Sequence, residues 1–159
     1  MPQMKLPVLT VLLCTLFLSA GTAGAQCNLS VTNVSFGTYD VFTAMPLDSD
    51  SGRVNISCAP DVNRATVTIG ASATSGNFNP RRMKHTTGSD LMDYNIYITA
   101  ARTAIWGDGT GGTSVVQARR PPGKPQPWAT SIGIFGRIPA GQNISAGPYT
   151  DNLTVTVTP

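Results

Sequence analysis

The sequence Tyr149-Thr150-Asp151-Asn152-Leu153-Thr154-Val155-Thr156-Val157-Thr158 alternates between two kinds of residue. The odd-numbered positions hold Tyr, Asp, Leu, Val and Val, whereas the even-numbered positions hold only Thr and Asn. Successive side chains of a β-strand point to opposite faces, so this pattern predicts a strand with one buried face and one exposed face. The stretch therefore indicates a β-sheet protein.

Shorter alternating runs occur along the rest of the chain, separated by turn residues. In residues 53–58, for example, Val54, Ile56 and Cys58 alternate with polar residues. Further runs lie at 28–36 (with a change of register inside it), 65–71, 91–100, 114–118 and 131–138, and residues 46–52, 72–80, 106–113 and 119–127 are expected to connect them. Period-two patterning at this spacing is typical of an antiparallel β-sandwich in a single domain.

The composition excludes several other classes of protein. All eight acidic residues are Asp, and Lys occurs only at positions 5, 84 and 124. Helix interiors favour Glu, Lys, Leu and Gln, whereas this chain is rich in the Thr, Ser, Gly, Val and Asn of strands and turns. A helical bundle and a doubly wound α/β fold are therefore excluded. Only 12% of residues are charged and the net charge is +3, so the chain lacks the dense basic face that nucleic-acid binding needs.

Residues 1–25 have the pattern of a secretory signal peptide. Lys5 supplies a positive start, and residues 6–20 form an apolar run. That run is about 15 residues long, shorter than the roughly 20 needed to span a bilayer. Ala23 and Ala25 place small residues before a predicted cut at Gln26. We expect an exported domain of residues 26–159 without stable membrane insertion, the alternative being an uncleaved anchor.

Two cysteines, Cys27 and Cys58, remain after the predicted cleavage. In an oxidising compartment, two cysteines of a small secreted domain are expected to pair. The alternative is a nucleophilic cysteine acting with His85, the single histidine, but no neighbouring residue would orient that ring. A zinc site lacks the usual ligand spacing. We expect no catalytic residue, metal or cofactor, and hence no enzyme.

Three other stretches could be considered as binding sites but are better interpreted as loops or sheet edges. Residues 107–112 match G-x-G-x-x-G, but a β-branched stretch follows where a dinucleotide site needs a helix, and Asp108 alone cannot complete a calcium shell. Arg119-Arg120 with Lys124 is interpreted as a solvated loop or a blunted sheet edge, with a phosphate or glycan contact as the alternative. Residues 81–85 are likewise interpreted as a basic, soluble loop.

A series of stretches, taken in order and spacing, resembles the spore coat protein U family, the domain that also builds pilins of archaic chaperone–usher systems. These stretches are Cys27, VSFGTYD at 34–40, GRVNISC at 52–58, Arg82-Met83, Leu91, Tyr94, Ile96, Tyr97, WGDGT at 106–110, GRIPAGQ at 136–142 and GPYTD at 147–151. The resemblance implies an all-β, immunoglobulin-like antiparallel sandwich that lacks its final strand. It also implies a disulfide between Cys27 and Cys58, tying the first strand to the second.

The same resemblance implies a secreted structural subunit of a pilus or coat. Such a subunit passes through the periplasm with a chaperone, is delivered to an outer-membrane usher, and reaches the cell surface by donor-strand complementation with other subunits. The strand-acceptor edge is expected at Tyr149, Leu153, Val155 and Val157, since the sequence ends at Pro159 and leaves nothing to pair along that strand.

One departure from the family pattern affects the expected role. Polymerising members carry an N-terminal extension before the first cysteine, whereas only Gln26 would precede Cys27 after the predicted cut. We therefore expect a tip or terminal subunit, which accepts a strand and does not donate one. The alternatives are a free spore or cell coat protein, or an adhesin that binds a glycan or an abiotic surface. The binding loops of such an adhesin would be residues 106–113 and 119–127, and its candidate contact residues are Tyr97, Trp106 and Trp128.

Overall fold

The computed structural model describes residues 26–123 and 127–159, so the predicted signal peptide lies outside the described residues. The described residues form strands and turns and contain no helix. The strands are β1 (Cys27–Thr32), β2 (Leu47–Cys58), β3 (Arg64–Ile69), β4 (Arg81–His85), β5 (Leu91–Tyr97), β6 (Val116–Arg119), β7 (Trp128–Ile138), β8 (Tyr149–Thr150) and β9 (Val155–Thr158).

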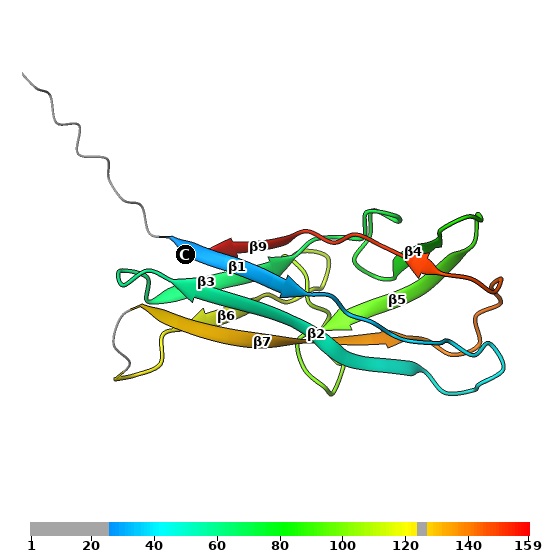
Figure 1. Cartoon of the computed structure of the whole chain (residues 1–159), viewed down its shortest axis with the longest axis horizontal. Helices are drawn as coiled ribbons and strands as arrows, with labels where there is room; N and C mark the ends of the chain where they lie inside the picture. The colour runs from blue at the N-terminus through cyan, green and yellow to red at the C-terminus, as the bar shows by residue number, and fades with distance from the viewer. Residues whose placement is uncertain (1–25, 124–126) are drawn as a thin grey trace, which may run out of the picture.

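Two antiparallel sheets make up the sandwich. The larger contains six strands in the order β1-β2-β7-β5-β4-β8, and the smaller contains three in the order β6-β3-β9. β1 is an edge of the larger sheet and β9 an edge of the smaller, and the two run along the same side of the elongated molecule (Figure 1). The predicted all-β, immunoglobulin-like class is confirmed.

The core lies between the sheets and follows the alternation of the sequence. Val54, Ile56 and Cys58 on β2 are buried, and the residues between them are more exposed. On β3, Val67 and Ile69 face them from the other sheet with almost no exposed surface. Burying apolar surface in this way stabilises the fold by about 25 cal/mol per Å², so the spacing of apolar residues determines how the two sheets pack.

The first two strands are joined at one end by the predicted disulfide. Cys27, the first residue of β1, lies opposite Cys58, the last residue of β2, and their sulfurs are bonded. The two cysteines are 31 residues apart. Closing a loop of that length constrains the unfolded chain and contributes about 3 to 4 kcal/mol in the chain-entropy model.

The final segment differs from the single strand that the sequence predicted over residues 149–158. β8 pairs with β4 of the larger sheet, whereas β9 pairs with β3 of the smaller sheet. The chain therefore crosses between the sheets at residues 151–154, which belong to neither ladder. The break is tertiary in origin, because each half follows the strand beside which it lies.

Two other expectations about the strands were wrong. Residues 81–85 form β4 rather than a loop, and Arg81 on it has 0% exposed surface. Residues 47–52 belong to β2 rather than to a connection, with an irregularity between Ser49 and Gly52 where pairing with β7 shifts. Charged and polar residues there led to both errors, because the tertiary contacts that place them in strands are not visible locally. The expected register change in 28–36 corresponds to the end of β1 at Thr32.

Candidate functional site

The last segment keeps one alternation of exposure across the crossing between the sheets. Tyr149, Asp151, Leu153, Val155 and Val157 are all half-buried, and the even-numbered residues between them are exposed. The five odd-numbered side chains thus face the interior in the register that the sequence predicted, even though the hydrogen-bonded strands are interrupted. These five residues are called the odd row below.

The backbone groups of the even-numbered residues point toward β3 and β4. Thr156 lies opposite Thr68, and the carbonyl of Thr154 accepts a hydrogen bond from the Gly70 amide at 2.8 Å. Nearer β4, the carbonyl of Pro148 accepts one from the Thr86 amide at 2.9 Å. In an extended chain, alternate residues turn their N–H and C=O groups to opposite edges.

The odd row consequently turns its backbone groups to the other edge. Within residues 26–123 and 127–159, no strand pairs with that edge. This unpaired edge runs along β8, residues 151–154 and β9, and therefore borders both sheets. We call it the free edge. An extended chain lying beside it would find a row of unpaired donors and acceptors.

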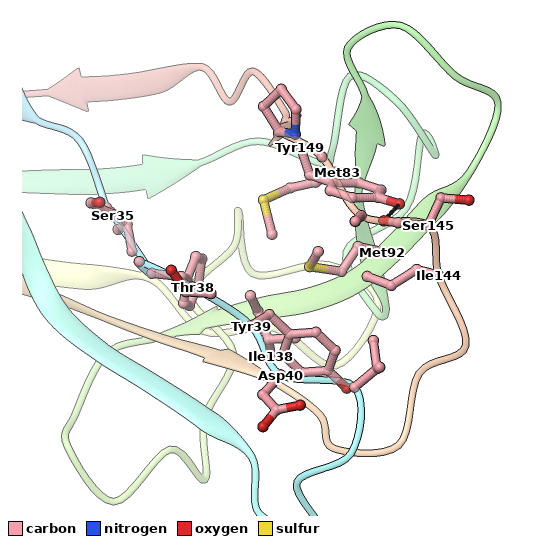
Figure 2. Close-up of a pocket in the computed structure, with 17 residues that line it drawn as sticks. Ser35, Thr38, Tyr39, Asp40, Met83, Met92, Ile138, Ile144, Ser145 and Tyr149 are labelled. Carbon is pink, nitrogen blue, oxygen red and sulfur yellow. Dashed lines mark hydrogen bonds between the residues drawn. The ribbon is translucent and has the colours of Figure 1, made fainter.

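A groove of two adjoining cavities lies beside the free edge. The larger has a volume of about 640 Å³ and the smaller about 320 Å³. Both are lined by Val34, Phe36, Met83 and Tyr149. In the larger cavity, the side chains of Met83 and Met92 lie between the 34–41 segment and the 144–149 segment (Figure 2). The groove therefore has two walls, residues 34–41 (the first wall) and residues 144–149 (the second wall). Core residues form its floor.

Two glycines of the larger sheet allow the first wall to lie close against that sheet. A Cβ on Gly52 would come within 2.5 Å of the Val34 side chain, and one on Gly136 within 2.6 Å of the Phe36 ring. The second wall is held by Gln142, whose side-chain oxygen accepts a hydrogen bond from the Asp93 amide at 2.7 Å and whose side-chain nitrogen donates to the Asp93 carbonyl at 2.8 Å. These contacts fix the groove walls to the larger sheet.

The core is uncovered where the groove meets β1. Leu29 lies opposite Ile56, and Val31 lies opposite Val54. Residues directly opposite in a ladder share a face of the sheet, so all four side chains face the core. Ile56 and Val54 are 2% and 0% exposed, yet Leu29 and Val31 are 39% and 42% exposed. Within the part of the chain that the structure describes, the outer strand of the larger sheet thus has an interior face that is only partly covered.

The comparisons with known proteins agree with this architecture. A family model described as the Spore Coat Protein U domain matches residues 13–156. The chain belongs to this family. The chain is also 29% identical over 134 residues to Protein U of Myxococcus xanthus. This match covers 79% of this chain and 70% of that protein.

A solved structure shares the fold of this spore coat protein U domain. It is the crystal structure of the CsuC–CsuE chaperone–tip adhesion subunit pre-assembly complex from the archaic chaperone-usher Csu pili of Acinetobacter baumannii. The match to one of its chains has a TM-score of 0.58 at 21% identity and covers 84% of this chain and 39% of that one. The present chain therefore spans about two fifths of the length of the matched chain.

A buried tyrosine fixes the crossing at Asp151. The Tyr94 hydroxyl donates to Asp151 Oδ2 at 2.7 Å, while Asp151 Oδ1 accepts from the amide and the hydroxyl of Thr74, at 3.2 and 3.0 Å. The carboxylate is thus turned to partners from β5 and from the connection between β3 and β4, which explains an Asp in an otherwise apolar row. Burial, reinforced by the hydrogen bond and the negative charge of Asp151, raises the pKa of Tyr94 far above its ordinary value.

This raised pKa predicts a loss of stability at alkaline pH. Below about pH 10 the tyrosine is protonated in the folded and unfolded chains, so its contribution is fully present. Above that pH the unfolded chain releases a proton that the folded chain retains. The free energy of unfolding should then fall by about 1.4 kcal/mol per pH unit from this group alone. Urea denaturation at pH 8 and pH 11 measures the loss.

Tyr94→Phe provides the reference for this prediction. The variant lacks the titrating hydroxyl, so its stability should fall less than that of the native chain between pH 8 and pH 11. It should also be less stable at pH 8 by about 1.5 to 3 kcal/mol, since the hydrogen bond to a charged group is lost. Equal alkaline losses in both proteins would contradict the assignment.

The remaining candidates from the sequence lie elsewhere. Trp106 and Trp128 are 0% and 3% exposed and donate their indole N–H groups to the carbonyls of Val67 and Val62. Both are thus core residues rather than exposed adhesin contacts. Asp108 accepts hydrogen bonds from the amide and hydroxyl of Thr110 at 2.9 and 2.6 Å, which closes its own loop. Among the described residues, no group of three or more His, Cys, Asp or Glu is placed to hold a metal, and no helix could cross a membrane.

His85 packs against the second wall of the groove. Its Nδ1 accepts a hydrogen bond from the Gly88 amide at 2.8 Å, and its ring lies edge-on to the Tyr149 ring with centroids 4.9 Å apart. The histidine therefore supports a turn and a wall, and the cysteines are bonded to each other instead. The groove floor was not predicted. Met83 lies in residues 81–85, which were interpreted as a basic loop, and Met92 lies in the expected strand over residues 91–100 but was not assigned to its buried face.

Proposed function

We propose that this chain is a structural, non-catalytic subunit of a cell-surface fibre or coat that is completed by a β-strand from another protein. The free edge beside an uncovered core carries the proposal. Membership of the Spore Coat Protein U domain family supports it. So does the fold shared with a chain of a chaperone–tip adhesion subunit complex from chaperone-usher pili.

The strand-acceptor edge in this proposal consists of Tyr149, Leu153, Val155 and Val157. Their side chains are half-buried and their backbone groups point to the free edge. An inserted strand would pair with these groups and bury its own apolar side chains between β1 and β9. Each side chain fully buried in this way contributes about 1.5 to 3 kcal/mol. Hydrogen bonds and apolar contacts thus favour the same occupant.

The proposal gives the chain three kinds of partner. A periplasmic chaperone would first supply the missing strand, because an exposed apolar edge otherwise promotes aggregation. An outer-membrane usher would receive the complex, and a neighbouring subunit would finally replace the chaperone's strand. The signal peptide proposed over residues 1–25 would start this route by export.

Amide hydrogen exchange tests the acceptor edge directly. In the monomeric, oxidised chain the amides of Leu153, Val155 and Val157 should exchange rapidly, because they point to solvent. The Thr156 amide, which faces β3, should be protected and serves as the internal control. Adding a strand peptide of alternating Val and Thr should slow exchange at the three odd positions by tenfold or more and leave Thr156 unchanged.

Two results would contradict the proposal. Slow exchange at Val155 and Val157 in the monomer without peptide would mean that the edge is already occupied. Rapid exchange that a saturating excess of peptide does not change would mean that the edge accepts no strand. NMR resolves the individual amides and distinguishes both cases from general loosening of β9, which would also expose Thr156.

We further propose a terminal position in the assembly. If export removes residues 1–25, Gln26 alone precedes the disulfide-bonded Cys27 and cannot fill the groove of a second copy. The purified, exported protein should then fail to form chains with itself while still binding the strand peptide. Polymers that dissolve when the peptide is added in excess would instead indicate a repeating subunit.

A further inference from the structure

An ordered turn presents a bare aromatic side chain close to the groove. Asp40 Oδ1 accepts a hydrogen bond from the Phe42 amide at 2.9 Å, and Asp40 Oδ2 accepts one from the Thr43 hydroxyl at 3.2 Å. The Thr43 amide also donates to the Asp40 carbonyl at 3.2 Å. Phe42 at the tip is 94% exposed and Met45 is 72% exposed. We call residues 40–45 the Phe42 turn.

The base of the Phe42 turn is tied to the groove. The Tyr39 hydroxyl donates to the Pro139 carbonyl and accepts from the Gln142 amide, each at 2.9 Å. Tyr39, Asp40 and Val41 all line the larger cavity, and Phe42 is the next residue along the chain (Figure 2). The exposed apolar tip therefore continues the first wall of the groove beyond its end.

An exposed phenylalanine on a hydrogen-bonded turn is well suited to binding. Aromatic anchors dominate many interfaces, and a turn whose backbone is already ordered loses little backbone conformational freedom when it is covered. The local hydrogen bonds of Asp40 keep the turn in place before any partner arrives. Met45 adds a flexible thioether that adapts to the shape of its partner.

The position of the turn identifies its occupant. A strand inserted in the larger cavity would lie between residues 34–41 and residues 144–149, which line it. Where it left the cavity on the side of Val41, it would pass the Phe42 turn. An extended chain advances about 3.3 Å per residue, so two or three further residues would extend the donor by about 7 to 10 Å on that side.

We propose that the inserted strand continues past the groove and packs an apolar side chain onto Phe42 and Met45. This inference rests on the proposed strand-accepting function and adds to it a requirement on the donor. The donor must contain an apolar residue outside the segment that complements the sheet. The Phe42 turn then distinguishes a matching donor from one that only fills the groove.

Three labelled peptides test this requirement with the refolded, oxidised chain. The core peptide has nine residues of alternating Thr and Val, with two lysines on a flexible linker for solubility. The second and third add Leu-Ser-Leu at the amino end or at the carboxyl end. Fluorescence anisotropy gives each affinity. One of the two extended peptides should bind about tenfold more tightly than the core peptide, which corresponds to burying most of one leucine.

Variants at the surface show where the gain arises. Phe42→Ser should abolish the tenfold gain and leave the affinity for the core peptide unchanged. Leu91→Ser is the matched control. Leu91 is 40% exposed, and its neighbour Met92 lines the larger cavity, so Leu91 points to the opposite face of β5. This control should keep the full gain.

The possible outcomes distinguish failure of the proposed strand-accepting function from failure of the proposed contact at the Phe42 turn. Failure of all three peptides to bind would overturn the proposed function and the inference with it. Binding of the core peptide with no gain from either extension, or a gain that survives in Phe42→Ser, would overturn the inference alone. If Phe42→Ser changes only the self-association of the chain without peptide, the turn contacts a second copy and the inference is wrong.

Discussion

A chain that carries its own complementing strand should unfold about 10 to 15 °C above the native chain and remain monomeric. In this variant an Asn-Gly turn replaces Thr158 and Pro159 and leads into a nine-residue strand that runs back along the free edge. Asn-Gly favours the tight turn of a two-residue hairpin. The strand places Val or Leu opposite Val157, Val155, Leu153 and Tyr149, and Thr opposite Asp151.

The expected size of this effect follows from burial and ordering. Four apolar side chains contribute about 1.5 to 3 kcal/mol each when fully buried. Ordering the added strand offsets much of this gain, at about 1 to 2 kcal/mol per backbone residue, while new hydrogen bonds return about 1 kcal/mol each. We expect a net gain on the order of 4 kcal/mol. For a domain of this size each kcal/mol raises Tm by roughly 3 to 4 °C.

A matched control separates complementation from the addition of a tail. It keeps the turn and the Thr positions but replaces the four apolar residues with Ser. Its Tm, measured by circular dichroism, should stay within about 2 °C of the native value, and its tendency to associate should not fall. Equal Tm values for the two fusions would show that the groove accepts no strand. The comparison uses folded, oxidised proteins throughout.

The sequence predicted the alternation of exposure along the free edge but not the way that edge is built. The exposure pattern of residues 149–157 follows directly from alternation along one segment. The division between β8 and β9 depends on pairing with β4 and β3, which lie far away in sequence. Local patterning determines which face a side chain takes, whereas partner strands determine which sheet it joins.

The groove itself was beyond the reach of local patterns. Val34 and Met92 are more than fifty positions apart, yet both line the larger cavity. Val34 was expected in a strand, but nothing in its neighbourhood indicated a wall beside a cavity. Phe42 gave no signal either, since the sequence around an apolar turn residue does not show whether another segment covers it. Such features depend on how separate segments meet.

Arg81 and Arg82 show the same limit in adjacent residues. Their local sequence indicates a soluble basic loop, but in the structure they point to opposite faces of β4. Arg81 is fully buried, and its guanidinium donates to the carbonyls of Gly70 and Trp106 at 2.8 and 2.7 Å and to Asn95 Oδ1 at 2.8 Å. Its Cζ also lies 5.4 Å from the centre of the Phe78 ring. The side chain thus links β4 to the connections beside the smaller sheet.

Arg81→Met should therefore destabilise the fold by about 5 kcal/mol. The substitution keeps an apolar stem but deprives the Gly70 and Trp106 carbonyls of their guanidinium donor, each costing about 1 to 3 kcal/mol. It also removes one of the two donors to Asn95 Oδ1, which keeps the hydrogen bond from the Ile96 amide. Arg82→Met is the matched control. Arg82 forms an ion pair with Asp93 at 2.8 Å, and their side chains are 43% and 39% exposed, so its loss should cost at most about 1 kcal/mol.

Urea denaturation of both variants measures the difference. Arg81 also holds the Gly70 carbonyl, and the Gly70 amide donates to Thr154 in the last segment. Loss of Arg81 should consequently loosen β9 and the free edge, so that the Thr156 amide exchanges faster than in Arg82→Met. If Arg81→Met is no less stable than Arg82→Met, water must satisfy the exposed carbonyls, and the buried guanidinium is not needed to hold the two sheets in place.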